Sequence, residues 1–313
     1  MLEIKDLSVR YGKQAPTIEH FNLNMKKGEI ISVVGESGSG KTTVIRAVLG
    51  ALAGGGKVTQ GDILFNGKSL LTNTKDEWRQ LRGTRISMIF QDCGGTLNPI
   101  RKIGSQFVEY ICTHSKVSKD EAWKKGVSML EKMRLPEAEN IMNSYPHQLS
   151  GGMRQRVMIA MAMSSDPKIL IADEPTTALD VTIQAQILHL LLELQKKNNM
   201  SIILITHDLG VVAQTCKRVA VLCGGYVVEE GTVEEIFLHP GHPYTQALIA
   251  SMPRVGGTFE QFLERDLSDG NGDLCPFLNR CKYADKPCEA CLPKYYEASE
   301  GHRIFCHRRE EKR

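Results

Sequence analysis

A glycine-rich segment near the start of the chain restricts its fold more than any other feature does. Residues 35–42 read Gly-Glu-Ser-Gly-Ser-Gly-Lys-Thr, the G-x-x-x-x-G-K-[ST] form of a phosphate-binding loop. The apolar run from Glu29 to Val34 predicts a buried strand before it, and the spacing from Thr42 to Leu52 predicts a helix after it. A loop in that context gathers unpaired N–H groups and partial positive charge for an anion. The segment therefore predicts an α/β fold that binds a nucleoside triphosphate, and a chance glycine-rich turn explains it poorly.

The residue types of this segment suit the phosphates and their metal ion. Glycines let the backbone turn so that consecutive N–H groups converge on one point. We expect Lys41 to reach the β- and γ-phosphates and the Thr42 hydroxyl to bind Mg²⁺. Thr43 is explained at least as well as a residue of the first helical turn. The expected nucleotide contacts here are Gly35, Ser37, Gly38, Ser39, Gly40, Lys41, Thr42 and Thr43.

A second apolar run, from Lys168 to Ala172, ends in two acidic residues. A strand of a parallel sheet that is buried on both faces reads in this way, and ligands bind at its carboxyl end. Asp173 is placed to hold Mg²⁺, directly or through water, and Glu174 could polarise the attacking water. Phosphoryl transfer needs mainly charge stabilisation and a positioned water, so these two roles suffice. Two solvated acids at a strand end are the weaker explanation.

A third segment, from Leu149 to Gln155, precedes a strongly helical stretch. Ser150 is expected to cap that helix. A cap does not explain Gly151 and Gly152, because successive glycines cost flexibility unless the backbone must approach something closely. Their N–H groups are available to an anion at the helix start. We therefore expect this segment to recognise phosphate.

Together these motifs resemble the ATP-binding cassette (ABC) family. The resemblance implies a P-loop nucleotide-binding fold with a RecA-like core, an antiparallel β subdomain and a helical subdomain. It implies that ATP is hydrolysed with Mg²⁺. It also implies that two cassettes face each other, and that each presents its segment Ser150, Gly151 and Gly152 to the γ-phosphate held by the other.

The resemblance assigns four more residues by their order along the chain. Gln91, after a strand-like run, is implied to contact Mg²⁺ or the attacking water and to link the site to a transmembrane partner. His207, after another apolar run, is the implied γ-phosphate contact, where it could stabilise the transition state. Asp180 ends the segment from Ala178 that resembles the dimer-contacting loop. Tyr11 is the implied adenine platform, although a tyrosine in a surface turn is also plausible.

The chain divides into a cassette, residues 1–232, and an extension, residues 233–313. A helical insertion at about residues 100–160 is charged with apolar spacing. In the family this insertion docks the membrane subunit, and a plain surface lobe is the alternative. Within the extension, the segment from Leu238 to Leu248 is similar to a segment in one branch of the family, the ATPase subunits of oligopeptide, dipeptide and nickel importers. Residues 93–96 depart from that branch's usual Pro-Met-Thr-Ser, and the linker from Val255 to Asp273 lacks its prolines.

The extension also holds five of the nine cysteines. Four thiolates suit either a 4Fe-4S cluster or tetrahedral zinc. The sequence around Cys275 and Cys281 resembles a C-terminal motif that holds a 4Fe-4S cluster in some members of the branch, which favours iron–sulfur over zinc. Disulfides are a weaker explanation than a metal site, because the compartment is expected to be reducing. Simple buried thiols are also weaker, because the segment is short and polar. The expected ligands are Cys275, Cys281, Cys288 and Cys306, with Cys291 as a substitute for Cys288.

The formal charge of +3 carries no global signature of nucleic-acid or membrane binding. No apolar run approaches the ~20 residues that cross a bilayer, and the charged start carries no cleavable signal. We therefore expect a peripheral protein at the cytoplasmic face of the inner membrane. The resemblance implies a second, related but different cassette chain and two permease subunits as partners. An extracytoplasmic solute-binding protein would act indirectly, and no nucleic acid is expected.

The leading functional hypothesis is the energy-coupling ATPase subunit of an importer of dipeptides or oligopeptides. Nickel or another metal complex is the alternative cargo. A soluble ABC ATPase acting on nucleic acid or ribosomes is the second class, but such proteins usually carry two cassettes or long coiled-coil insertions. A redox or metal sensor with structural ATP is the third, and Glu174 and His207 argue against an inert site.

Overall fold

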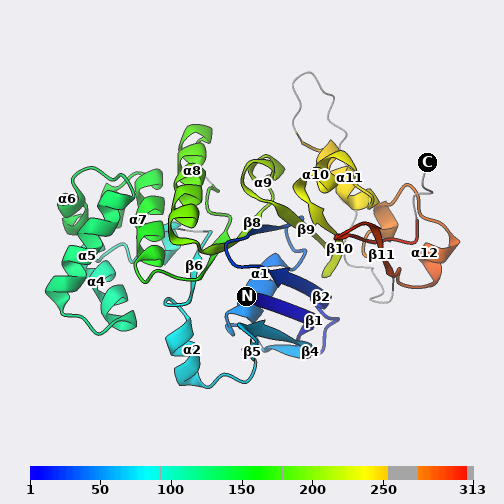
Figure 1. Cartoon of the computed structure of the whole chain (residues 1–313), viewed down its shortest axis with the longest axis horizontal. Helices are drawn as coiled ribbons and strands as arrows, with labels where there is room; N and C mark the ends of the chain where they lie inside the picture. Colours follow the sequence, from blue (N-terminus) through cyan, green and yellow to red (C-terminus); the bar gives the residue numbers. More distant parts are fainter. Residues whose placement is uncertain (92, 178, 253–273, 309–313) are drawn as a thin grey trace. The chain divides into compact units, whose positions relative to one another are not determined.

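The structure is a computed structural model that describes residues 1–91, 93–177, 179–252 and 274–308. Two compact units make up the chain (Figure 1). The first comprises Met1–Lys26, Ile30–Thr72 and Ile205–Arg313, and the second comprises Lys27–Glu29 and Asn73–Leu204. Ala178 and the linker from Val255 to Asp273 lie outside the described residues. The boundary expected at residue 232 stays a prediction.

The first unit begins with an antiparallel sheet, blue in Figure 1. Its strands are β1 (Leu2–Tyr11), β2 (Ile18–Met25), β4 (Gly56–Phe65) and β5 (Lys68–Ser69), in the order β2-β1-β4-β5. Ile4 of β1 faces Leu23 on one neighbour and Ile63 on the other, and all three are buried. This sheet is the antiparallel β subdomain that the resemblance implies.

A second group of strands in the first unit carries the phosphate loop. β3 (Ile30–Val34) is parallel to β9 (Arg218–Cys223), and the order continues as β9-β10-β12-β11. The other strands are β10 (Tyr226–Thr232), β11 (Tyr295–Ser299) and β12 (His302–Phe305). The expected hairpin around residues 223–225 is confirmed, because β9 and β10 pair there antiparallel.

Short helices accompany these strands. They are α1 (Lys41–Val48), α9 (Leu209–Thr215), α10 (Val233–Leu238), α11 (Pro243–Ala250), the 3-10 turn η3 (Leu278–Arg280) and α12 (Lys286–Ala290). Helix α1 ends earlier than the apolar spacing predicts, because Leu49 caps it and Gly50 takes a left-handed φ of 57°. One apolar core joins α9, α10 and α11 to β9, β10 and β12, and its buried aromatic members are Tyr226, Tyr244, Phe277 and Phe305.

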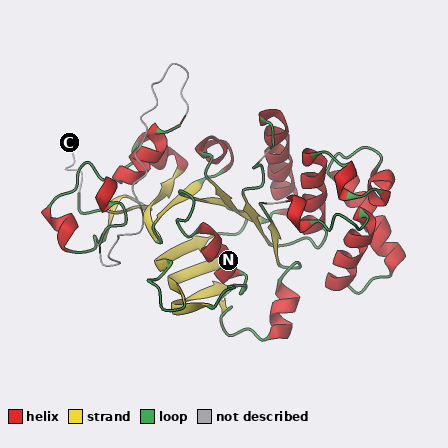
Figure 2. Cartoon of the chain, turned by 180° about the vertical axis from the view of Figure 1, so that it is seen from behind, coloured by secondary structure: helices red, strands yellow, loops and turns green. Residues whose placement is uncertain are grey.

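The second unit is mainly helical (Figure 2). Its helices are α2 (Lys75–Leu81), α3 (Cys93–Thr96), α4 (Ile103–His114), α5 (Lys119–Lys132), α6 (Ala138–Asn143), η1 (Pro146–Gln148), α7 (Gly151–Met163) and α8 (Val181–Asn198). Ser118 and Glu121 form a capping box that starts α5. Helices α4, α5 and α6 contact one another, and α5 contacts α7. These helices form the helical subdomain.

Two strands of the second unit, β6 (Ile86–Ile89) and β7 (Ile169–Asp173), are parallel. β8 (Ser201–Thr206) follows β7 in the sheet order; it belongs to the second unit up to Leu204, and its last two residues belong to the first. Every residue of β7 is buried, as expected for a strand covered on both faces. Across the described ranges, no helix is both long and apolar enough to cross a membrane.

Candidate functional site

The phosphate loop joins β3 to α1 in the first unit, as the sequence predicts. Gly40 has a φ of +107°, and a Cβ there would lie 2.4 Å from Ile18 Cδ1, so the loop needs glycine at this position. Gly35 allows a close approach, because a Cβ there would lie 2.2 Å from the carbonyl oxygen of Leu222. Among the described residues, no side chain caps α1 at Gly40, which leaves the helix start to backbone N–H groups.

The Lys41 side chain lies inside the loop and is 8% exposed. Its Nζ donates to the carbonyl oxygens of Gly35 and Glu36, each at 2.7 Å. The Ser39 hydroxyl is buried and has no hydrogen-bond partner among the described residues. A buried polar atom without a partner is costly, so a ligand that satisfied it would be stabilised. The loop therefore suits an anion.

The neighbouring positions differ in exposure. Ser37, Gly38 and Thr42 are exposed, whereas Thr43 is buried. This difference agrees with Thr42 as the residue that meets ligands and Thr43 as a packed residue of the first helical turn. Tyr11 ends β1, and its ring covers Gly56, where a Cβ would lie 2.6 Å from Tyr11 Cε1. A base-stacking role for this half-buried ring stays a prediction.

His207 follows β8 and belongs to the first unit. His207 is exposed. The next residue, Asp208, caps α9 by accepting from the N–H groups of Gly210 and Val211 at 2.8 and 3.2 Å. The cap fixes the backbone that leaves the strand. His207 is therefore presented at the carboxyl end of a buried strand, which is where it is expected.

In the second unit, the two acids lie at the end of β7. Asp173 is 7% exposed. Glu174 takes a left-handed φ of 46°, and its Oε2 accepts from Gln91 Nε2 at 2.8 Å and from Thr177 Oγ1 at 2.9 Å. From the sequence, Gln91 and Glu174 are two site residues with separate expected roles. The structure brings them into direct contact, with the carboxylate oriented by two donors.

A buried glutamine that sequence reasoning missed supports this turn. Gln155 of α7 is 3% exposed, and its Nε2 donates to the carbonyl oxygen of Pro175 at 2.6 Å. The contact ties α7 to the residue that follows Glu174 in the chain. A glutamine at the end of the segment from Leu149 to Gln155 is the signal that could have found it, since polar residues on buried helix faces need partners.

Helices α7 and α8 have capping residues that were expected to bind nucleotide. Ser150 Oγ accepts from Met153 N–H at 3.3 Å, and Asp180 Oδ1 accepts from Ile183 N–H at 2.9 Å. Gly152 also has a packing reason, because a Cβ there would lie 2.8 Å from Ile183 Cγ2. Gly152 therefore has a packing role, and its expected phosphate contact stays a prediction.

The cysteine-rich part lies in the first unit. Cys275, Cys281, Cys288 and Cys306 line one small cavity of about 20 Å³, together with His242 and Phe277. Burial raises the pKa of Cys275 and of Cys288 to about 11, and neighbouring thiols add to the shift at Cys275. Cys291 is exposed and is not part of this lining. The four cysteines expected as ligands therefore line one cavity, and Cys291, the expected substitute, does not line it.

A metal centre is not supported beyond this convergence. In the part of the chain that the structure describes, no group of three or more cysteine, histidine or acidic side chains is arranged to hold a metal ion. The cysteines with described side chains carry free thiols; they are Cys112, Cys216, Cys223, Cys275, Cys281, Cys288, Cys291 and Cys306. The side chain of Cys93 lies outside the described residues.

Comparison with known families gives two matches. The family model described as ABC transporter matches residues 18–177, and the model of the oligopeptide/dipeptide transporter C-terminal region matches residues 228–288. The second match includes Tyr244 and Arg280, which contact the phosphate loop residue Glu36.

Several curated proteins are similar over nearly the whole length. The dipeptide transport ATP-binding protein DppD of Lactococcus lactis is 44% identical, over 96% of this chain and 89% of its own. The oligopeptide transport ATP-binding protein OppD of Bacillus subtilis is 46% identical, over 97% of this chain and 87% of its own. OppD of Escherichia coli is 43% identical, over 94% of this chain and 89% of its own.

Solved structures of ATP-binding cassettes also match most of the chain. The dimeric ATP-binding cassette MJ0796, in a post-hydrolysis state bound to ADP and phosphate, matches with a TM-score of 0.66 and 29% identity. The match covers 74% of this chain and 99% of that one. The structure of cbiO1 from Clostridium perfringens, part of the transporter complex cbiONQ, matches with a TM-score of 0.67 and 31% identity, over 76% of this chain and 90% of that one.

Proposed function

The chain belongs to the ABC transporter family and is an ATP-hydrolysing, energy-coupling subunit, and we propose that the transporter it serves imports dipeptides or oligopeptides. The observation that carries this proposal is the match of residues 228–288 to the C-terminal region of oligopeptide/dipeptide transporters. The relatives named for peptide transport span almost the entire chain, cassette and extension together. Nickel or another metal complex is the alternative cargo.

In the first unit, we propose that the loop of residues 35–42 holds the ATP phosphates. Lys41 would exchange its two carbonyl partners for phosphate oxygens, and the exposed Thr42 hydroxyl would bind Mg²⁺. His207 would contact the γ-phosphate, where a donor stabilises the charge that develops in the transition state. Tyr11 would stack on adenine. The Ser39 hydroxyl, which has no described partner, supports a ligand in this loop.

In the second unit, we propose that Asp173 is the acidic Mg²⁺ ligand and that Glu174 polarises the attacking water. Gln91 orients the Glu174 carboxylate at 2.8 Å and would also reach Mg²⁺ or the water. A carboxylate held by two donors keeps one geometry, which favours a positioned water. When bound, Mg²⁺ neutralises phosphate charge.

We further propose that Ser150, Gly151, Gly152 and Asp180 act on the nucleotide of a second cassette. Their position at the starts of α7 and α8 supports this role, because helix starts present N–H groups to anions. The dimeric solved relative supports a paired arrangement. The partner would be a related but different chain. The pair would lie at the cytoplasmic face of the membrane on two permease subunits, which receive cargo from an extracytoplasmic binding protein.

We also propose that Cys275, Cys281, Cys288 and Cys306 hold a metal centre, a 4Fe-4S cluster in preference to zinc. The support is that these four thiols line one cavity. Bound metal would replace the thiol protons, and its binding energy would stabilise a small segment with little apolar surface. The cluster would supply a structural or redox centre.

Purification from membranes tests the cargo and the partners. The tagged chain, extracted in detergent with its neighbours, should carry two multi-span proteins and a second cassette. Reconstituted in liposomes with the binding protein, its ATPase activity should rise with di- or oligopeptides and not with nickel. Stimulation by nickel alone would select the alternative cargo. ATPase activity without membrane partners and stimulated by nucleic acid would overturn the proposal.

A further inference from the structure

One peptide group in the phosphate loop is held from both sides. The N–H of Glu36 donates to the Tyr244 hydroxyl at 2.9 Å, and the carbonyl oxygen of Gly35, in the same peptide group, accepts from Lys41 Nζ at 2.7 Å. In a trans peptide these N–H and C=O groups point in opposite directions. The orientation of this peptide plane therefore links the Tyr244 hydroxyl to the Lys41 ammonium.

The Glu36 side chain is held by the same extension. Arg280 Nη1 lies 2.9 Å from each carboxylate oxygen of Glu36, and the Arg280 side chain is 11% exposed. The guanidinium lies over the rings of Phe277 and Tyr244, at 5.1 and 5.8 Å from their centroids. Burial acts to lower the pKa of Arg280, but the hydrogen bonds and charge of Glu36 outweigh it and raise that pKa. The ion pair is therefore oriented and partly desolvated.

Tyr244 itself is placed by a buried network. It lies at the start of α11, it is 1% exposed, and its ring packs edge-on against Phe277 at 5.3 Å. His242 caps this helix by accepting from Tyr244 N–H at 3.0 Å. Glu229 of β10, which is fully buried, accepts from the N–H groups of Gly241 and His242 at 2.8 and 2.9 Å. The hydroxyl therefore sits on a rigid support.

We propose that Tyr244 and Arg280 are positioning residues for ATP binding: they fix the backbone at Glu36 and thereby aim Lys41 at the phosphates. The carbonyl oxygens of Gly35 and Glu36 both accept from Lys41, and Glu36 is the residue that Tyr244 and Arg280 of the extension bind. Without the contacts of Tyr244 and Arg280 to Glu36, this peptide plane can rotate, and the Lys41 ammonium is no longer oriented toward the phosphates. The inference rests on the proposed nucleotide role of this loop.

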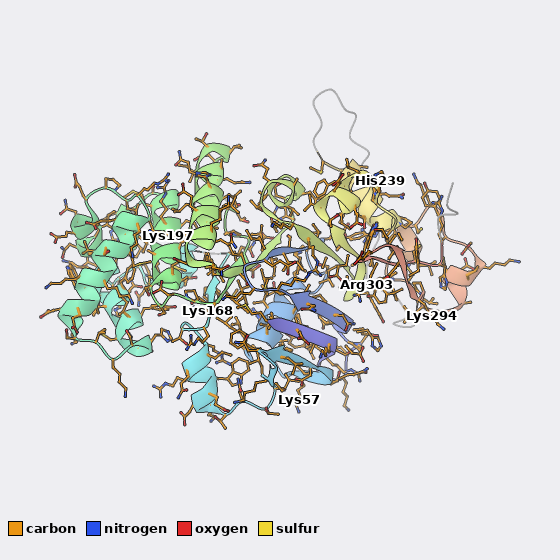
Figure 3. All side chains as sticks on the ribbon, viewed as in Figure 1. Lys57, Lys168, Lys197, His239, Lys294 and Arg303 are labelled. Atoms are coloured by element: carbon orange, nitrogen blue, oxygen red, sulfur yellow. The ribbon has the colours of Figure 1, made fainter. Side chains whose placement is uncertain are left out.

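A purely structural role for Tyr244 would reside in its ring, which fills the core. The substitution Tyr244→Phe keeps the ring and removes the hydroxyl, so it separates packing from positioning. The matched control is Tyr295→Phe, since Tyr295 is a half-buried tyrosine of the extension whose hydroxyl donates to a backbone atom, Val227 O, at 2.7 Å. Arg280→Met has its own control in Arg303→Met. Arg303, labelled in Figure 3, pairs with Glu230 at 3.0 Å.

The test measures ATP affinity, the KM for ATP and kcat on the complete transporter complex. Tyr244→Phe should raise the Kd and KM for ATP about fivefold, the effect of one lost hydrogen bond, with kcat at saturation within about twofold. Arg280→Met should raise both about fivefold or more, and Arg280→Lys should recover part of the loss. Glu36→Gln combined with Arg280→Met should be non-additive. The two controls should leave Kd and KM unchanged.

The inference is overturned if Tyr244→Phe has the same Kd and KM for ATP as its control Tyr295→Phe, and if Arg280→Met likewise matches its control Arg303→Met. Lys41→Ala separates this failure from a failure of the proposed function. Loss of ATP binding in Lys41→Ala with normal binding in the Tyr244 and Arg280 variants rejects positioning alone. Normal ATP binding in Lys41→Ala rejects the assignment of the loop itself.

Discussion

Gln91 and Glu174, 83 positions apart in the sequence, are joined by a hydrogen bond of 2.8 Å from Gln91 Nε2 to Glu174 Oε2. Thr177 Oγ1 donates to the same oxygen at 2.9 Å. Both donors stabilise the ionised carboxylate and fix its direction. Two donors from the same chain thus orient Glu174, as a base that positions water would require.

Glu174→Gln should leave ATP binding intact and nearly abolish turnover. The amide keeps the shape of the side chain but cannot polarise water as a carboxylate does, so kcat should fall by about 10² or more. ATPase rates and ATP affinity, measured on the same preparation, check this. Lys41→Ala should show the opposite pattern, with weak binding as its main defect. Full ATPase activity in Glu174→Gln would remove Glu174 from the proposed role.

The two glycines at the start of α7 should respond differently to alanine. At Gly152 a Cβ would lie 2.8 Å from Ile183 Cγ2, whereas at Gly151 it would lie 3.4 Å from Leu179 Cδ2, an ordinary contact. Gly152→Ala should therefore lower the free energy of unfolding by about 1–3 kcal/mol. Gly151→Ala should change it by less than about 0.5 kcal/mol.

Urea denaturation of both variants beside the parent protein measures these costs. Equal stability of the two variants would contradict the packing reason for Gly152. If both variants also lose ATPase activity while Gly151→Ala keeps its stability, the result supports a nucleotide contact at this helix start.

Local patterns in the sequence were enough to predict the loop, the paired acids and the strand–loop–helix context of Lys41. The ion pair of Glu36 with Arg280 was not predictable, because its members are 244 positions apart and each reads as a surface charge. Tyr244 and Glu36 are 208 positions apart. The convergence of four cysteines was predicted from a resemblance. Spacing alone could not have told Cys288, which lines the cavity, from the exposed Cys291.

Stability should fall in mild acid partly through His114. Burial lowers the pKa of His114 below 6.5 in the folded protein, and its ring packs against Tyr110 at 4.7 Å. A histidine with a depressed folded pKa binds protons more readily when unfolded. Above pH 6.5 the neutral His114 does not change the free energy of unfolding. That free energy decreases as the pH falls from 6.5 through the folded pKa.

Urea midpoints at pH 7.5 and 5.5 should therefore move less in His114→Gln than in the parent protein. The control is His239→Gln, because His239 is exposed at the end of α10 (labelled in Figure 3). An unchanged pH dependence in His114→Gln would contradict the prediction.

Removing one thiol at a time should separate the ligands of the proposed metal centre from the spare cysteine. Cys306→Ser removes a side chain that lines the cavity shared with Cys275, Cys281 and Cys288, whereas Cys291→Ser removes an exposed one outside it. Anaerobically purified Cys291→Ser should keep the parent's metal content and visible absorbance, and Cys306→Ser should lose both. Because bound metal stabilises the folded state alone, chelation should lower the Tm of the parent and not of Cys306→Ser. Metal analysis identifies iron or zinc. Equal metal content in the two variants, or none in the parent, would exclude the four-cysteine site.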